Sequence, residues 1–357
     1  MRYHLSPKNT VIVRGPASII LLAGQATVLG GPIVANQTKI VASQKQLPIE
    51  TETGAELEIA GELAEIFEIQ GSTIPSSWRL AATALEQMRE ETSVILGPPD
   101  VGKSTLCVYL VNKLLQSGLT LRVIDADIGQ ADMGPPTTIG SAVPTRPIIS
   151  LQELRPDRRL FIGTISPSGV EQKLISGIQR LMATGSKMLT IINTDGWVSD
   201  FAAILYKINL LTQLQPDLVL GLTYSNEIEP ILGGVRFHSM KVAAAKDALE
   251  RSRVDRRFIR ADAYRRSLEG AITRRVSLEV PLILPAGLRQ VSRSDRRVLN
   301  NLIVGILDEE GYLAQIGILM GIDDEGAWIY SRQAEAPRTV EVGRVKLSTS
   351  GSEIGFL

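Results

Sequence analysis

Hydrophobic residues follow two different patterns along the chain. Near the N-terminus, short apolar runs are separated by Gly and Pro, which predicts strands at residues 10–13, 18–22, 39–42 and 56–59. From residue 92 onwards, short apolar runs alternate with segments of helix length. This alternation is typical of a mostly parallel sheet that is covered by helices on both faces.

The middle of the chain carries the strands and helices of this sheet. We expect its strands at residues 93–96, 121–124, 160–162, 188–192 and 218–222. Helices are predicted at residues 79–91, 103–116, 170–183 and 201–214. An arginine-rich stretch at about 241–275 is predicted as a long helical arm, and strands return at residues 278–284, 313–319, 327–330 and 339–347.

These patterns divide the chain into three expected parts. A chain of 357 residues is too long for one ordinary core. We predict an α/β protein with an N-terminal β domain over residues 1–78, a central domain over 79–276 that includes the arginine-rich arm, and a C-terminal β domain over 277–357. The uncharged stretch at 15–35 is broken by Gly and Pro, so it predicts strands and turns rather than a membrane-spanning or signal helix.

Composition narrows the kind of partner that the protein can have. Lys plus Arg and Asp plus Glu number 38 each, so no net field draws the protein towards nucleic acid or a membrane surface. An anionic ligand must therefore be held by a local group of charges. The single cysteine, Cys107, cannot form an intrachain disulfide and fits a reducing compartment. We expect a cytoplasmic protein without a membrane partner.

The strongest chemical signal is a glycine-containing turn between the predicted strand at 93–96 and the helix that follows. Residues 97–104 match the complete pattern G-x-x-x-x-G-K-S. Backbone N–H groups in such a loop converge on phosphate oxygens, Lys103 adds a positive charge, and the Ser104 hydroxyl can ligate Mg²⁺. We therefore predict that ATP and Mg²⁺ are bound by the residues of this P-loop: Gly97, Pro98, Pro99, Asp100, Val101, Gly102, Lys103, Ser104 and Thr105.

A pair of acidic residues follows the next predicted strand. The segment at 125–130 reads Asp-Ala-Asp-Ile-Gly-Gln. Ligands of open α/β sheets bind at the carboxyl ends of the strands, so Asp125 and Asp127 are expected to face the bound phosphates. One carboxylate is expected to hold Mg²⁺, and the other could accept a proton from an attacking hydroxyl. A plain polar exit from the strand is the alternative interpretation.

A third strand is followed by Thr194, Asp195, Gly196 and Trp197. Glycine beside tryptophan at a strand end leaves room for an exposed indole on which a base or ribose could stack. Taken alone, the signal is weak, because tryptophan is more often part of the core.

The arginine-rich arm is the fourth candidate. Residues 251–275 contain nine arginines against three acidic residues. Arg256 and Arg260 are four residues apart and would share one face of a helix. The guanidinium fork suits phosphate recognition, and a mobile arm could supply an arginine finger for phosphoryl transfer. A solvated charged face is the alternative for a charge run of this kind.

Together, these motifs resemble the Clp1/Grc3 family of polynucleotide 5′-hydroxyl kinases. The resemblance rests on the P-loop, the Asp-x-Asp-x-Gly-Gln segment, the Thr-x-Gly-Trp segment and the arginine-rich lid, in this order. The segments at 11–18 and 74–78 are also similar, so the resemblance covers nearly the whole chain. It implies a β-sandwich N-terminal domain, a central P-loop NTPase domain with a mostly parallel sheet, and a C-terminal β domain.

The resemblance also implies an activity, namely transfer of the γ-phosphate of ATP to the 5′-hydroxyl end of RNA, with DNA ends left open as acceptors. Lys103, Ser104 and Thr105 would hold phosphates and Mg²⁺. Asp127 would be the general base, with Asp125 and Gln130 supporting the metal or the substrate. The terminal nucleotides would be gripped by a clasp made of Thr194, Asp195, Gly196 and Trp197. The transferring phosphoryl group would be covered by lid arginines, namely Arg256, Arg260, Arg265 and Arg266.

Three other functions use the same motifs. An ATP-bound scaffold in an RNA-processing complex would retain the nucleotide without turnover. An NTPase switch would hydrolyse ATP without any acceptor. A small-molecule kinase shares the chemistry but does not need the clasp or the two flanking β domains.

Overall fold

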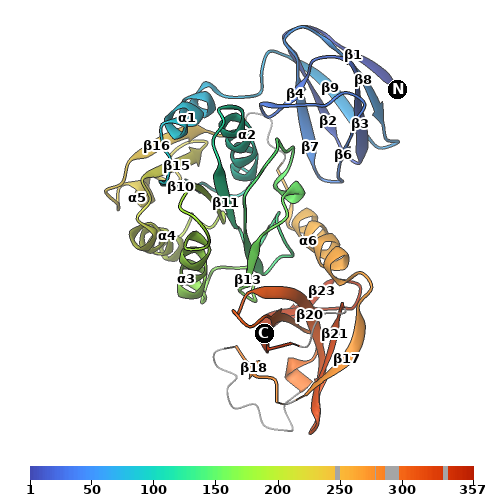
Figure 1. Ribbon diagram of the computed structural model, residues 1–357, viewed down its shortest axis with the longest axis vertical. Helices are drawn as coiled ribbons and strands as arrows, with labels where there is room; N and C mark the ends of the chain where they lie inside the picture. The colour runs from blue at the N-terminus through green and yellow to red at the C-terminus, as the bar shows by residue number, and fades with distance from the viewer. Residues whose placement is uncertain (246–249, 278, 286–296, 333–336) are drawn as a thin grey trace. The chain divides into compact units, whose positions relative to one another are not determined.

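The protein is described by a computed structural model that covers residues 1–245, 250–277, 279–285, 297–332 and 337–357 (Figure 1). The chain forms two compact units. The first contains residues 1–123, 143–154 and 186–252, and the second contains residues 124–142, 155–185 and 253–357. Each unit therefore combines segments that are far apart in the sequence. The division into three consecutive domains stays a prediction.

The first unit begins with two antiparallel sheets. Alternate residues of β8 are buried, which is the pattern of a strand with one covered face. One sheet has the order β1 (Arg2–Leu5), β8 (Ala55–Ala60), β3 (Ala17–Gly24) and β6 (Thr38–Val41). The other has the order β5 (Gly31–Pro32), β4 (Thr27–Val28), β7 (Gln46–Glu50), β2 (Asn9–Arg14) and β9 (Glu65–Gln70). The four strands predicted in this region are confirmed, whereas β1, β4, β5, β7 and β9 were not predicted.

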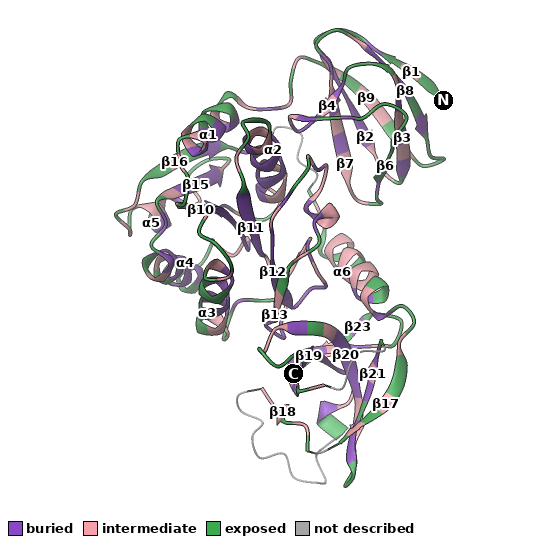
Figure 2. Cartoon of the chain, viewed as in Figure 1, coloured by how far each residue is buried: buried purple, intermediate pink, exposed green. Residues whose placement is uncertain are grey.

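A seven-stranded sheet forms the centre of the chain, in the order β13-β12-β11-β14-β10-β15-β16. In the first unit, β14, β10, β15 and β16 run parallel to one another, whereas β12 and β13 of the second unit are antiparallel. This confirms the mostly parallel sheet, and Figure 2 shows its buried strands. The strands are β10 (Thr92–Leu96), β11 (Leu121–Ala126), β12 (Thr138–Ala142), β13 (Arg158–Phe161), β14 (Leu189–Thr194), β15 (Leu218–Thr223) and β16 (Ser239–Ala243).

The helices beside these strands are largely those predicted. Helices α2 (Lys103–Gln116) and α4 (Phe201–Leu214) have the expected bounds, and α3 (Glu171–Met182) is one residue shorter at each end. Helix α1 (Ser76–Glu86) begins three residues earlier and ends five residues earlier than expected, with Pro75 as its N-cap residue. The short α5 (Glu229–Leu232) packs against α4. Among the described residues, no helix has the length and apolar character needed to cross a membrane.

The arginine-rich arm is a shorter helix than the sequence suggested. Helix α6 covers only Arg253–Leu268. The expectation of a helix over about 241–275 is wrong at both ends, because Ser239–Ala243 pairs with β15 and β17 (Ile272–Ser277) pairs with β21 (Gly326–Ser331). Residues 246–249 lie outside the described part of the chain. Sheet pairing therefore overrides helical propensity on both sides of α6.

The second unit ends in another seven-stranded sheet, with the path β17-β21-β20-β19-β22-β18 and β23 paired to β22. Its core contains Tyr264 and Leu268 of α6. The sequence analysis missed β19, whose six residues are all buried. Of the strand expected at 278–284, only Leu282–Ile283 is a strand, and residue 278 lies outside the described residues. The remaining strands are β18 (Leu282–Ile283), β19 (Leu302–Leu307), β20 (Leu313–Ile322), β22 (Thr339–Leu347) and β23 (Glu353–Phe356).

One buried amide joins three segments of the first unit. Asn112 lies on α2 and is completely buried. Its Nδ2 donates to the carbonyl oxygens of Leu29 at 3.1 Å and Ile148 at 2.8 Å, and its Oδ1 accepts from the Ile148 N–H at 2.8 Å. The β4–β5 hairpin is thereby attached to the helix that begins at the P-loop.

Replacing Asn112 by Leu is expected to lower the free energy of unfolding by at least about 2 kcal/mol, because each buried backbone group that loses its partner costs roughly 1–3 kcal/mol. Denaturation in urea measures the change. Asn209→Leu is the matched control, because Asn209 is an exposed residue of α4. Equal stability of the two variants would contradict a joining role for Asn112.

Candidate functional site

The P-loop of the first unit joins β10 to α2. Gly97 and Gly102 have φ of 155° and 98°, and Asp100 between them has φ of 59°. A Cβ atom on Gly97 would lie 2.6 Å from the Leu222 carbonyl oxygen, so only glycine fits at this position. The loop therefore turns tightly enough to direct its backbone towards the N-terminus of α2, where anions bind.

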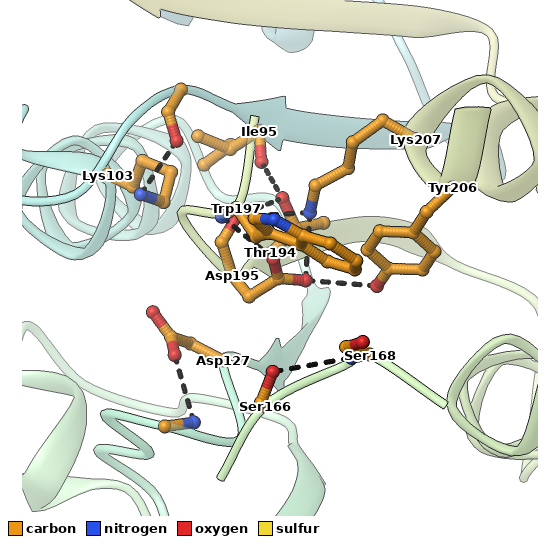
Figure 3. Close-up of polar contacts among 12 residues, drawn as sticks. Ile95, Lys103, Asp127, Ser166, Ser168, Thr194, Asp195, Trp197, Tyr206 and Lys207 are labelled. Carbon is orange, nitrogen blue, oxygen red and sulfur yellow. Dashed lines mark hydrogen bonds and ion pairs between the residues drawn. The ribbon is translucent and has the colours of Figure 1, made fainter. Parts of the chain in front are cut away.

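Lys103 is the first residue of α2 and is only 7% exposed. Its Nζ donates to the carbonyl oxygens of Gly97 at 3.0 Å and Pro98 at 2.8 Å (Figure 3). The backbone of the loop thus surrounds the ammonium group of Lys103. This arrangement holds a positive charge beside the backbone that the sequence analysis assigned to phosphate binding.

The end of β14 contacts the P-loop and the strand before it. Asn193 donates from Nδ2 to Ser104 Oγ at 3.3 Å, and Thr194 donates from Oγ1 to the Ile95 carbonyl at 2.8 Å. Because β14 and β10 are parallel neighbours, their carboxyl ends meet at one edge of the sheet. Asn193 was not predicted as part of the site, although the sequence shows a polar residue directly after an apolar run at this position.

The clasp segment at 194–197 packs directly on the P-loop. A Cβ atom on Gly196 would lie 2.8 Å from the Pro99 nitrogen and 3.0 Å from its Cα. Real Cβ atoms do not approach backbone so closely, so the absence of a side chain at Gly196 permits this contact. The two predicted motifs therefore lie side by side.

Asp195 turns into the protein rather than towards solvent. Its carboxylate forms an ion pair with Lys207 of α4 at 2.8 Å, and the two side chains are 6% and 0% exposed. Tyr206 also donates its hydroxyl to Asp195 Oδ2 at 2.9 Å, and the Trp197 N–H donates to Oδ1 at 3.0 Å (Figure 3). These bonds fix the turn that carries Gly196.

Lys207 was not predicted as part of the site. It is the only charged residue in α4, whose sequence is otherwise mostly apolar. A lone charge in a buried helix requires a partner, and that requirement was the signal that could have identified it.

Trp197 is half-buried, which is intermediate between an exposed stacking indole and a core residue, the two interpretations of its sequence position. Its ring stacks on that of Tyr206 with centroids 5.8 Å apart and an interplanar angle of 27°. Its Nε1 donates to Asp200 Oδ2 at 2.6 Å. Tyr206 and Asp200 therefore hold the indole in one orientation at the end of the clasp.

The second unit carries the acidic pair. Asp125 Oδ2 accepts hydrogen bonds from the N–H groups of Asp132 at 2.7 Å and Met133 at 3.2 Å. Burial, together with the negative charges of Asp132 and Asp127, raises the pKa of Asp125 to about 7. A positively charged partner would stabilise the ionised form of a buried carboxylate that has acidic neighbours.

Asp127 lies in a turn that orients its side chain. Its Oδ1 accepts from the N–H groups of Gly129 at 3.2 Å and Gln130 at 3.0 Å. A Cβ atom on Gly129 would lie 2.8 Å from the Ile165 carbonyl oxygen, so the loop after β13 packs against this turn. Sequence analysis did not identify that loop, which contains two of the serines labelled in Figure 3, Ser166 and Ser168.

The arginines of α6 divide between two sides of the helix. Arg260 forms paired hydrogen bonds with the carboxylate of Glu353 on β23, one of them 2.9 Å from Nη2 to Oε2. Arg256, one turn earlier and half-buried, shares its side of the helix. Arg265 and Arg266 both pair with Asp262 and are mainly exposed. At 3.6 residues per turn, Arg265 projects about 180° away from Arg256. Arg256 and Arg260 therefore lie on one side of α6 and Arg265 on the other.

In the described part of the chain, no group of three or more His, Cys, Asp or Glu side chains is placed to hold a metal ion.

Replacing Lys207 by Met is expected to lower the free energy of unfolding by about 3–5 kcal/mol, because it leaves the buried Asp195 carboxylate without its counter-charge. Chemical denaturation measures the loss. Asp195→Asn combined with Lys207→Met should recover part of it. Lys241→Met is the matched control, because Lys241 pairs with Glu229 near the surface and such pairs contribute about 0–1 kcal/mol. Losses of equal size in the two single variants would contradict the prediction.

Comparison with known proteins shows what this chain is similar to. Residues 97–270 match the family model described as "mRNA cleavage and polyadenylation factor CLP1 P-loop". A polyribonucleotide 5′-hydroxyl-kinase of Pyrococcus furiosus is 29% identical over 327 residues, which cover 76% of this chain and 92% of the relative. One of the same name from Methanocaldococcus jannaschii is 25% identical over 326 residues, covering 74% of this chain and 89% of the relative.

A solved structure has the same fold. A chain from the structure of a wild-type Clp1p–Pcf11p complex superposes with a TM-score of 0.73, covers 97% of each chain and is 11% identical in sequence. The chain is therefore similar to Clp1-type P-loop proteins in its matched P-loop region, in its relatives and in its fold.

Proposed function

We propose that this protein is an ATP-dependent polynucleotide 5′-hydroxyl kinase, which transfers the γ-phosphate of ATP to the 5′-hydroxyl end of RNA and, as a second class of acceptor, DNA. The observation that carries the proposal is the contact between Gly196 and Pro99, which holds the clasp against the P-loop. A segment held at this position can bring an acceptor beside the bound phosphates, which a kinase requires. The names of the archaeal relatives describe a polyribonucleotide 5′-hydroxyl-kinase activity.

The P-loop would bind the triphosphate. Backbone N–H groups at the start of α2 supply donors, and the dipole of the helix favours negative charge at this end. Lys103 would exchange the carbonyl oxygens of Gly97 and Pro98 for phosphate oxygens, because a phosphate is a stronger partner for an ammonium group than a neutral carbonyl.

Ser104 and Asp125 are the proposed ligands of Mg²⁺. The Ser104 hydroxyl accepts a hydrogen bond from Asn193. A hydroxyl oxygen has two lone pairs, so the second one can still bind a cation. Burial and acidic neighbours raise the pKa of Asp125, and a divalent cation would offset this cost of its negative charge. Mg²⁺ is commonly held by one or two protein oxygens together with substrate phosphates, so this small donor set fits. The ion would neutralise charge on the phosphates.

Asp127 is the proposed general base for the 5′-hydroxyl group. The N–H groups of Gly129 and Gln130 hold its carboxylate in one orientation, which a positioned base requires. The O–H bond of the acceptor breaks as its oxygen attacks the γ-phosphorus, the proton passes to Asp127, and ADP leaves with the electrons of the broken P–O bond. Gln130, beside this carboxylate, would contact the acceptor strand.

The clasp would position the acceptor, and α6 would stabilise charge. Trp197, held by Tyr206 and Asp200, presents a fixed indole for stacking with a terminal base. Asp195 has a structural role in this proposal, because Lys207 and Tyr206 occupy its carboxylate. Arg256 and Arg260 would stabilise the transferring phosphoryl group, and Arg265 and Arg266 would attract the nucleic-acid backbone. The cytoplasmic location expected from the sequence stays a prediction.

The activity is tested with γ-labelled ATP, Mg²⁺ and RNA or DNA oligonucleotides that carry either a 5′-hydroxyl or a 5′-phosphate. Label is expected only on 5′-hydroxyl ends. Lys103→Ala and Asp127→Ala are each expected to lower the rate by at least about 10²-fold, because they remove phosphate stabilisation and general base catalysis.

Two other outcomes separate the alternatives. ATP retained without labelling or hydrolysis would indicate a scaffold, and ATP hydrolysed without dependence on a 5′-hydroxyl end would indicate an NTPase switch. Either outcome would overturn the kinase proposal.

Gly196→Ala is expected to lower kcat by about 10-fold or more, because a Cβ atom at this position pushes the clasp away from Pro99, and small displacements of reacting groups are costly. The labelling assay measures the rate, and a thermal melt checks that the variant folds. Gly321→Ala is the control, because a Cβ atom there meets open space and its φ is not positive. An unchanged rate in a folded Gly196→Ala variant would show that the contact is not needed for catalysis.

A further inference from the structure

Glu353 is a buried carboxylate that lies far along the chain from every predicted motif. It is the first residue of β23, and its side chain is only 3% exposed. Both of its carboxylate oxygens accept hydrogen bonds from Arg260, from Nε and Nη2. Such a paired arrangement fixes the plane of a guanidinium group as well as its position.

The backbone beside Glu353 is fitted to α6. The glycine two residues earlier, Gly351, has φ of +86°, and a Cβ atom there would lie 2.7 Å from the Arg265 nitrogen and 2.9 Å from the Ala261 carbonyl oxygen. Arg257 donates from Nη2 to the Glu353 carbonyl oxygen. The segment that carries the carboxylate is therefore held against the helix independently of Arg260.

The electrostatic surroundings of Arg260 include the proposed catalytic base. Burial alone would lower the pKa of Arg260, but the hydrogen bonds that Arg260 donates to Glu353 and the negative charges of Glu353 and Asp127 outweigh it, and the pKa is raised. The negative charge of Asp127 thus acts on Arg260, while the carboxylate of Glu353 binds its guanidinium group. All three residues belong to the second unit.

Stability gives little reason for this pair. A buried ion pair is weak evidence for stability, because desolvation of the two charges offsets their attraction. Glu353 also has a geometric effect that an apolar residue of similar volume would lack, since it sets the direction of the Arg260 guanidinium. Positioning of a charge in advance is the property that catalysis by electrostatic stabilisation requires.

We infer that Glu353 is a positioning residue, which holds Arg260 in the orientation used for phosphoryl transfer beside Asp127. The inference rests on the proposed kinase function. It also assigns a role in catalysis to the C-terminal sheet, because β23 pairs with β22 of that sheet. Glu353 does not touch the reacting groups and acts through Arg260.

A kinetic cycle tests the role. Glu353→Gln is expected to lower kcat by about 10-fold, which corresponds to about 1.4 kcal/mol of activation free energy, with KM for ATP and for the oligonucleotide changed by less than about twofold. Arg260→Ala is expected to have a larger effect. The double variant should then have the kcat of Arg260→Ala alone, because Glu353 has nothing left to position. An unchanged kcat in Glu353→Gln, or a double variant slower than Arg260→Ala by the full Glu353→Gln factor, would overturn the inference.

Matched variants separate positioning from folding. Glu341→Gln on β22 and Glu325→Gln before β21 remove the carboxylate partners of Lys173 and Arg275, and both are expected to keep the wild-type kcat. Glu353→Asp keeps the charge and should recover part of the activity. A loss of kcat that follows the melting temperature across all four variants would indicate a structural role only and overturn the inference.

A readout without turnover distinguishes failure of this inference from failure of the proposed function. In protein labelled with ¹⁵N-arginine, the Nε–H resonance of Arg260, assigned by its loss in Arg260→Ala, is expected to move in Glu353→Gln and in Asp127→Asn, and to stay in place in Glu325→Gln. These shifts would support the positioning of Arg260 even if no oligonucleotide were phosphorylated. A resonance that does not respond to Asp127→Asn would overturn it even if the kinase were active.

Discussion

The arrangement at the end of β14 depends on the buried ion pair between Asp195 and Lys207. The pair, completed by the Tyr206 hydroxyl, fixes the turn after the strand. That turn places Gly196 against Pro99 of the P-loop and leaves Trp197 stacked on Tyr206. Without a counter-charge for Asp195, the carboxylate would have to reach water, and the turn could not keep this geometry. A charge that contacts no substrate thus determines the shape of the clasp.

Charge pairing also divides the arginines of α6 into groups with different surroundings. Arg260 is enclosed and oriented by Glu353, whereas Arg265 and Arg266 share the exposed Asp262. Exposed pairs are weak and exchange readily with other anions, but an enclosed paired arginine keeps its direction. A chain with equal numbers of acidic and basic residues can therefore still offer two kinds of anion contact, one rigid and one adaptable.

Local signals made much of the fold predictable. The P-loop motif fixed the start of α2 at Lys103, and continuous apolar runs identified β10, β14 and β15, because strands buried on both faces have this pattern. The helix predicted over about 241–275 failed because Ser239–Ala243 and Ile272–Ser277 pair with distant strands, and no local pattern reports such pairing. The contacts of Asn193 and Glu353 could not be recognised locally, because their partners Ser104 and Arg260 are 89 and 93 residues away along the chain. Lys207 differs from them, because a lone charge among mostly apolar residues was visible in the sequence.

Asn112 binds the backbone of two distant segments rather than their side chains. Carbonyl and N–H groups are the same for almost every residue, so Leu29 and Ile148 can be exchanged for other apolar residues without disturbing these bonds. The attachment of the β4–β5 hairpin to α2 is therefore expected to leave no covariation between position 112 and its partners in related sequences. Methods that infer contacts from correlated substitutions would overlook the bonds between Asn112 and these segments, although position 112 itself would tolerate few other residues.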